Sequence, residues 1–103
     1  MHPLIENNLP AIRELCEKHK VKRLYVFGSA LRDDFQPGES DVDFAAEYKQ
    51  MSPCECARNY FGFVRSLKDL LKSEIDLIEM DAIRNKYFLE ELLETRRILY
   101  DAA

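Results

Sequence analysis

Residues 24–47 read LYVFGSALRDDFQPGESDVDFAAE, and this stretch decides the fold. Its first four residues are apolar without alternation, which is typical of a strand that is covered on both faces. Gly28-Ser29 then ends the strand and opens a short helix, predicted from Ala30 to about Asp34. The residues QPGE at 36–39 favour a turn. The alternation that begins with DVDF predicts a second strand over residues 41–47.

Three longer segments repeat apolar residues with the period of an amphipathic helix, over residues 9–19, 53–71 and about 85–100. Ser52 is placed to cap the second of these helices, with Pro53 in its first turn. A short strand is predicted at Ile75-Asp76-Leu77-Ile78. The order α-β-α-β-α-β-α predicts an α/β or α+β fold, in which helices flank a small mixed sheet of three or more strands.

Length, charge and cysteine content narrow the classes of protein to consider. The 103 residues predict a single domain over residues 1–103. A net charge of -4 argues against duplex nucleic acid or an anionic membrane as the main partner. The N-terminus lacks the basic start and apolar stretch of a signal peptide. Cys16, Cys54 and Cys56 cannot all pair within one chain, so we expect reduced thiols and a cytoplasmic location.

Asp41 and Asp43 are two residues apart on a predicted strand, so both carboxylates leave the same face. At a separation of 4–5 Å such a pair repels by roughly 1 kcal/mol in water, and by more in a lower dielectric. A cation would turn this repulsion into attraction, and donor sets made only of oxygen suit Mg²⁺ or Mn²⁺. The alternative is a solvated strand edge.

Two other features bear on chemistry. Gly28 has no Cβ, which lets a ligand approach the backbone, and Ser29 could bind a phosphate oxygen or simply cap the following helix. Asp76 interrupts an apolar strand, where a buried carboxylate must be paired, protonated or bound to metal. A hydrogen-bonded structural aspartate or an exposed edge position remains the alternative for Asp76.

The three features together resemble a known family. The stretches Val26-Phe27-Gly28-Ser29-Ala30-Leu31-Arg32 and Ser40-Asp41-Val42-Asp43-Phe44 are similar to the signature of the DNA polymerase beta-like nucleotidyltransferase superfamily. The small size and the tail over residues 85–100 resemble its minimal nucleotidyltransferase branch, the MntA-type partners of HEPN-domain toxins. The resemblance runs from about Val21 to Asp101 and implies the nucleotidyltransferase fold.

This resemblance implies a role for each candidate residue. Gly28-Ser29 would bind the β- and γ-phosphates of a nucleoside triphosphate, and Arg32 would contact a phosphate or the acceptor, unless it is a solvent-facing helix residue. Asp41 and Asp43 would hold two Mg²⁺ ions, with Mn²⁺ as a substitute. Asp76 would hold the catalytic ion and favour deprotonation of the acceptor hydroxyl.

The implied function is that of an antitoxin enzyme. It would transfer AMP from ATP to a tyrosine of a HEPN toxin, with which it would form a hetero-oligomer. One alternative is a non-catalytic antitoxin that acts by binding, although such a protein would not need the costly aspartate cluster. The other is a small-molecule nucleotidyltransferase subunit, but enzymes of that kind carry a further helical domain that 103 residues cannot hold.

Overall fold

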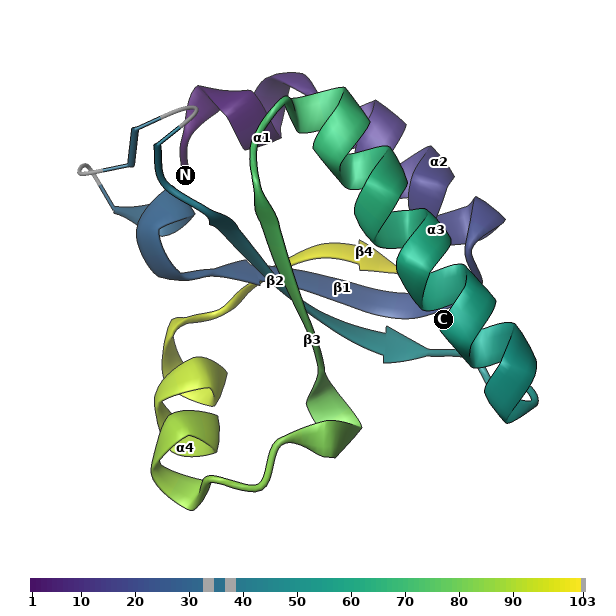
Figure 1. The fold of residues 1–103 in the computed structure, drawn as a ribbon. Helices are drawn as coiled ribbons and strands as arrows, with labels where there is room; N and C mark the ends of the chain where they lie inside the picture. Colours follow the sequence, from purple (N-terminus) through teal and green to yellow (C-terminus); the bar gives the residue numbers. More distant parts are fainter. Residues whose placement is uncertain (33–34, 37–38, 103) are drawn as a thin grey trace.

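The computed structural model describes residues 1–32, 35–36 and 39–102 of the chain. Within this part, a four-stranded sheet with the order β3-β2-β1-β4 lies between helices (Figure 1). The strands are β1 (Val21–Phe27), β2 (Val42–Tyr48), β3 (Ile75–Glu79) and β4 (Arg97–Asp101). The helices are α1 (Pro3–Asn7), α2 (Leu9–Lys18), α3 (Pro53–Leu71) and α4 (Lys86–Thr95), with 3₁₀ turns η1 (Gly28–Leu31) and η2 (Met80–Ala82).

The sheet is mixed, as the sequence predicts. β1 runs antiparallel to both β2 and β4, whereas β2 and β3 are parallel. A parallel pair needs a long crossover connection, which α3 provides here. Ser52 caps α3 as expected, because its hydroxyl accepts a hydrogen bond from the backbone N–H of Glu55 and Pro53 occupies the first turn.

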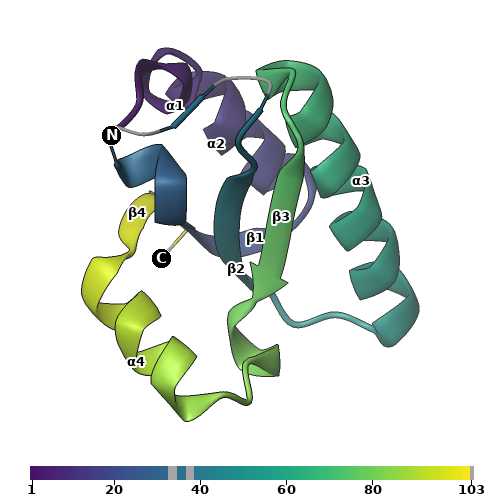
Figure 2. The ribbon, with the colours of Figure 1, turned by 60° about the vertical axis from the view of Figure 1, so that its left-hand side comes forward.

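Helices cover the two faces of the sheet unequally. α1, α2 and α3 lie on one face, and α4 lies on the other (Figures 1 and 2). The larger core is on the first face, where Val26 and Phe44 pack with Ile12, Phe63 and Leu67 of the helices. A smaller cluster on the second face consists of Tyr25, Ala45 and Leu92. The unbroken burial of residues 44–46 follows from this cover on both faces.

The structure corrects the prediction of a final helix that continues to Tyr100. α4 ends at Thr95, and Arg97–Asp101 forms β4, which pairs with β1. The pairing satisfies backbone groups of β1 that a longer helix would leave without partners. Leu92 and Leu99 are both buried and seven residues apart, a spacing that also fits one face of a helix, so the apolar pattern alone did not reveal the strand.

Two further differences are local. The helix predicted from Ala30 to about Asp34 is the four-residue turn η1, and Asp34 lies outside the described residues. The five-residue helix α1 was not predicted, and its start is stabilised by the His2 ring, whose Nδ1 accepts a hydrogen bond from the backbone N–H of Leu4. At the predicted 36–39 turn, the Glu39 N–H donates to the Gln36 carbonyl, while residues 37–38 lie outside the described part. No helix in the described ranges is long and apolar enough to span a membrane.

Candidate active site

Two of the three predicted aspartates are neighbours in the sheet. Asp43, near the start of β2, pairs in register with Asp76 on the parallel strand β3. Both therefore point to the face that α4 covers, because Asp43 alternates with Phe44, which belongs to the core on the other face. Asp76 is exposed on the edge strand β3, so the structure shows the exposed edge position that the sequence left open as an alternative to a buried carboxylate.

The environment of Asp43 disfavours its negative charge. Burial and then the charges of Asp76 and Asp41 raise the pKa of the half-buried Asp43 carboxyl from 3.8 to about 6, while the Arg32 guanidinium opposes the shift. The structure thus brings Asp41, Asp43 and Asp76 close enough to interact electrostatically, and it places Arg32 beside them.

Gly28 lies directly against this carboxylate. Its φ of +71° is a left-handed backbone conformation that residues with a side chain rarely adopt. A Cβ atom at this position would overlap Oδ2 of Asp43. Glycine at the end of β1 is therefore favoured for two reasons, the backbone conformation and the close approach of Asp43. A ligand at the turn would reach the aspartate without a side chain in between.

Ser29 and Arg32 flank the same turn. The Ser29 hydroxyl donates a 3.2 Å hydrogen bond to the backbone carbonyl of Asp41, which ties η1 to the residue before β2. Ser29 therefore does not cap a helix here, one of the two roles that the sequence left open. Arg32 is exposed at the end of the turn.

The donor chemistry of this cluster fits a hard divalent cation. The carboxylates of Asp41, Asp43 and Asp76 offer oxygen alone, and the mutual repulsion that raises the Asp43 pKa is what a cation would relieve. Across residues 1–32, 35–36 and 39–102, however, no three acidic, histidine or cysteine side chains are gathered tightly enough to hold one ion. For all three carboxylates to hold one ion, the exposed side chains of Asp41 and Asp76 would have to reorient.

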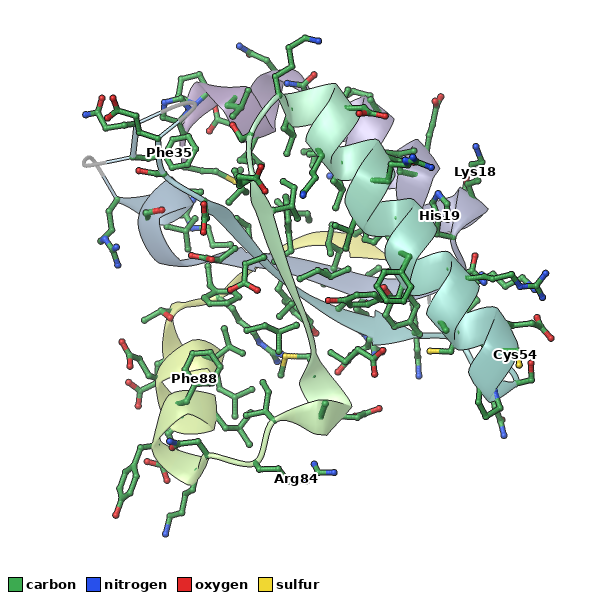
Figure 3. All side chains as sticks on the ribbon, in the orientation of Figure 1. Lys18, His19, Phe35, Cys54, Arg84 and Phe88 are labelled. Carbon is green, nitrogen blue, oxygen red and sulfur yellow. The ribbon has the colours of Figure 1, made fainter. Side chains whose placement is uncertain are left out.

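A cavity of about 460 Å³ opens between this cluster and α4. Gly28, Arg32 and Asp43 line it on the motif side. α4 contributes residues 88, 91, 92 and 95, which share one face of the helix at i, i+3, i+4 and i+7. Figure 3 shows Phe88 on α4, across the sheet from His19. The sequence did not place these α4 residues in the site, because their periodicity indicates only that this face is covered.

Comparisons with known proteins find one family by sequence and by fold. The chain matches the family model described as a nucleotidyltransferase domain over residues 11–99. A protein of Methanocaldococcus jannaschii, provisionally named a protein adenylyltransferase, is 34% identical over 82 residues, which cover 80% of each chain.

Solved structures share the fold. A provisionally assigned minimal nucleotidyltransferase superposes with a TM-score of 0.77 at 20% identity, covering 94% of this chain and 95% of that one. A chain in the solved complex of a tri-AMPylated Shewanella oneidensis HEPN toxin with MNT antitoxin gives a TM-score of 0.64 at 18% identity, covering 94% of this chain and 72% of that one.

Proposed function

The chain belongs to the nucleotidyltransferase domain family, and from this premise we propose that it transfers AMP from ATP to a tyrosine hydroxyl of a HEPN-domain toxin and so inactivates the toxin. The observation that carries the proposal is the contact between Gly28 and the carboxylate of Asp43, which pairs in register with Asp76 on the neighbouring strand. The cavity of about 460 Å³ that adjoins this contact gives a ligand access to Gly28 and Asp43, beside acidic groups that repel one another.

The proposed reaction is a substitution at the α-phosphorus of ATP. The tyrosine oxygen forms a bond to the α-phosphorus, and the bond from that phosphorus to the oxygen bridging to the β-phosphate breaks. Pyrophosphate leaves with the electron pair of the broken bond, and the hydroxyl proton passes to a carboxylate or to water. The Gly28-Ser29 turn and Arg32 hold the phosphates, and Asp76, which is exposed to solvent at the sheet edge, faces the incoming hydroxyl.

A divalent ion, Mg²⁺ in the first place, would be held by Asp41, Asp43 and Asp76. When bound it neutralises charge on the phosphates and on the attacking oxygen. The chain's own contribution is to keep Asp43 rigid, since the carboxylate is half-buried against Gly28 and on an interior strand.

Two observations support the proposal that the hydroxyl that accepts AMP belongs to a separate protein: the names of the relatives and the exposure of the site. The Methanocaldococcus jannaschii relative is named for transfer to protein, and the Shewanella oneidensis toxin carries AMP. In the described part of this chain Asp76 lies on the edge strand β3, and the side chains of Asp41 and Asp76 are exposed. Tyr87 and Leu93 of α4 are also exposed, at 78% and 49%, and offer apolar surface to a partner protein. On the same helix Leu92 is buried and Phe88 is partly buried.

The test combines the protein with its cognate HEPN toxin and Mg²⁺–ATP. A small molar fraction of wild type is expected to add one or more AMP masses to the toxin. Asp41→Asn combined with Asp43→Asn is expected to abolish the addition, whereas Asp69→Asn, which removes an exposed carboxylate from α3, leaves it intact. If the toxin gains no mass but is silenced at a one-to-one ratio, the protein acts by binding alone.

A further inference from the structure

We infer that the cavity between η1 and α4 binds the base of the nucleotide, and that Glu91 selects bases that carry an exocyclic amino group. This inference rests on the proposed function, because it assigns the base-binding part of the same site. It adds a determinant of specificity on an element, α4, that lies outside the Gly28-Ser29 and Asp-x-Asp motifs.

The walls of the cavity are suited to a planar apolar ring. Phe27, Leu31, Phe88 and Leu92 line it, and its volume of about 460 Å³ is within the usual range for small-molecule sites. Phe27 and Phe88 meet edge to face, with ring centroids 6.1 Å apart. Both rings are only partly buried, so part of their surface remains available for stacking. Nucleic-acid bases stack on such rings with little dependence on base identity.

The residues at the two ends of the cavity indicate how a nucleotide would be oriented in it. Gly28 and Asp43 line the same cavity as Phe88. A triphosphate held at the Gly28 turn is therefore at the polar end, and the apolar recess toward α4 is the adjoining space for the rest of the nucleotide. The opposite orientation would put phosphates against Leu92 and Glu91, which offer neither donors nor positive charge.

Glu91 supplies the polar contact at the α4 end. Its carboxylate is an acceptor only, so it favours a base edge that presents an N–H₂ group. The neighbouring Thr95 is less able to donate to a base, because its hydroxyl already donates to the Glu91 backbone carbonyl at 2.9 Å. Glu91 is exposed at the rim, where an amino group of a seated base would reach it without burial of an unpaired charge.

The first experiment separates base binding from phosphate binding. Affinities for Mg²⁺–ATP and for Mg²⁺–tripolyphosphate are measured by calorimetry on wild type and Phe88→Leu. Wild type is expected to bind ATP at least about tenfold tighter than tripolyphosphate, and Phe88→Leu is expected to lose most of that difference while keeping its tripolyphosphate affinity. Phe61→Leu is the matched control, because Phe61 is 69% exposed on α3, across the sheet.

The second experiment tests Glu91 with a substitution that leaves the core untouched. Purine riboside triphosphate differs from ATP by the missing amino group, and wild type is expected to bind it several-fold more weakly than ATP. Glu91→Ala is expected to bind the two nucleotides equally, whereas Glu90→Ala, one position away on the helix and not in the cavity, keeps the preference. Equal affinity of wild type for both nucleotides overturns the role of Glu91.

The outcomes distinguish this inference from the proposal beneath it. If wild type binds ATP and tripolyphosphate equally well, the cavity does not bind the base, yet transfer at the carboxylates still stands. If wild type binds neither compound in the presence of Mg²⁺, the proposed function fails and the inference fails with it.

Discussion

Asp43 of β2 and Asp76 of β3 are direct partners in the parallel register, so two carboxylates leave adjacent strands on the same face of the sheet. Neither side chain has a cationic neighbour in the sheet itself; the Arg32 guanidinium acts on Asp43 from the turn. The repulsion between these carboxylates lowers the stability of the folded protein, and the same negative charge favours a bound cation at this position.

Replacing Asp43 by Asn is expected to stabilise the metal-free protein at neutral pH. A carboxyl whose folded pKa, here about 6, lies above its unfolded value destabilises the fold once pH exceeds both values. Allowing for solvent around this half-buried group, the gain is about 1 kcal/mol, or a few degrees in Tm. Thermal denaturation in EDTA measures it, with Asp69→Asn as the control of unchanged Tm.

The same variant is expected to lose the response to ligand. Mg²⁺–ATP raises the Tm of wild type, since a ligand that binds only the folded state stabilises it, and this increase disappears in Asp43→Asn. A full Mg²⁺–ATP shift in the variant would show that Asp43 does not hold the ion.

Substitutions in the turn should differ sharply in severity. Gly28→Ala adds a Cβ that overlaps Asp43 Oδ2 and forces a side chain into φ +71°, so we expect lower Tm, by the equivalent of about 1–2 kcal/mol, and no nucleotide binding. Ser29→Ala removes one hydrogen bond, to the Asp41 carbonyl, at a cost of about 0.5–1.5 kcal/mol. Nucleotide titration of both variants checks the order, and normal ATP affinity in Gly28→Ala would remove the turn from the site.

The lowered pKa of His19 leads us to expect that the folded protein becomes less stable on mild acidification. Burial, and then the charge of Lys18, lowers the pKa of this imidazole below 6.5, while its hydrogen bond to Asn59 opposes the shift. Near pH 6.5 the unfolded chain therefore binds more protons than the folded one, so stability falls as pH decreases from 7 toward the folded pKa. Urea midpoints between pH 5 and 8 should show this slope in wild type and a smaller one in His19→Asn.

His19 also packs closely against Gly62 of α3, so an added side-chain atom at Gly62 should disturb the imidazole. A Cβ at Gly62 would lie 2.9 Å from Cε1 of His19, so Gly62→Ala should lower stability despite the better helix propensity of alanine. If Gly62→Ala is instead more stable than wild type, the imidazole moves freely and the acid sensitivity has another source.

The sequence predicted the parts of the site that are local in the chain and missed the parts that depend on distant contacts. Gly28, Ser29 and the Asp41–Asp43 pair are set by strand alternation and by a turn, both of which are readable over a few residues. The cover of the site by α4 depends on where that helix ends.

That end is set by tertiary contacts. Arg96 leaves the helix with extended backbone, and its guanidinium carbon lies 3.9 Å from the centroid of the Tyr25 ring on β1. Such a contact between residues 71 positions apart carries no periodic signal. The exposure of Asp76 was equally unreadable, because it depends on whether β3 is an edge or an interior strand.

The pairing of β4 with β1 gives a prediction about two adjacent residues. Leu99→Ala should cost about 2–5 kcal/mol, because Leu99 is 3% exposed, whereas Ile98→Ala, at 52% exposed, should cost less than about 1 kcal/mol. Chemical denaturation of the pair measures this difference. Similar costs at both positions would contradict the alternation of a strand at 97–101.

Asp76 allows the catalytic role of a carboxylate to be separated from its structural effect. Since Asp76 is exposed on an edge strand, Asp76→Asn should change metal-free stability by less than about 0.5 kcal/mol, with a slight gain from relief of repulsion with Asp43. If it holds the ion and draws the proton from the acceptor hydroxyl, AMP transfer to the toxin should fall by roughly 10²-fold or more, the usual contribution of a positioned base. Because Asp76→Asn would impair deprotonation of the acceptor rather than phosphate binding, its Mg²⁺–ATP affinity should fall far less than that of Asp43→Asn.

Transfer assays under single-turnover conditions measure the rate of AMP transfer by Asp76→Asn, and nucleotide titrations measure its affinity. A variant that transfers AMP at the wild-type rate would leave Asp43 as the functional member of the pair and reduce Asp76 to a source of local negative charge.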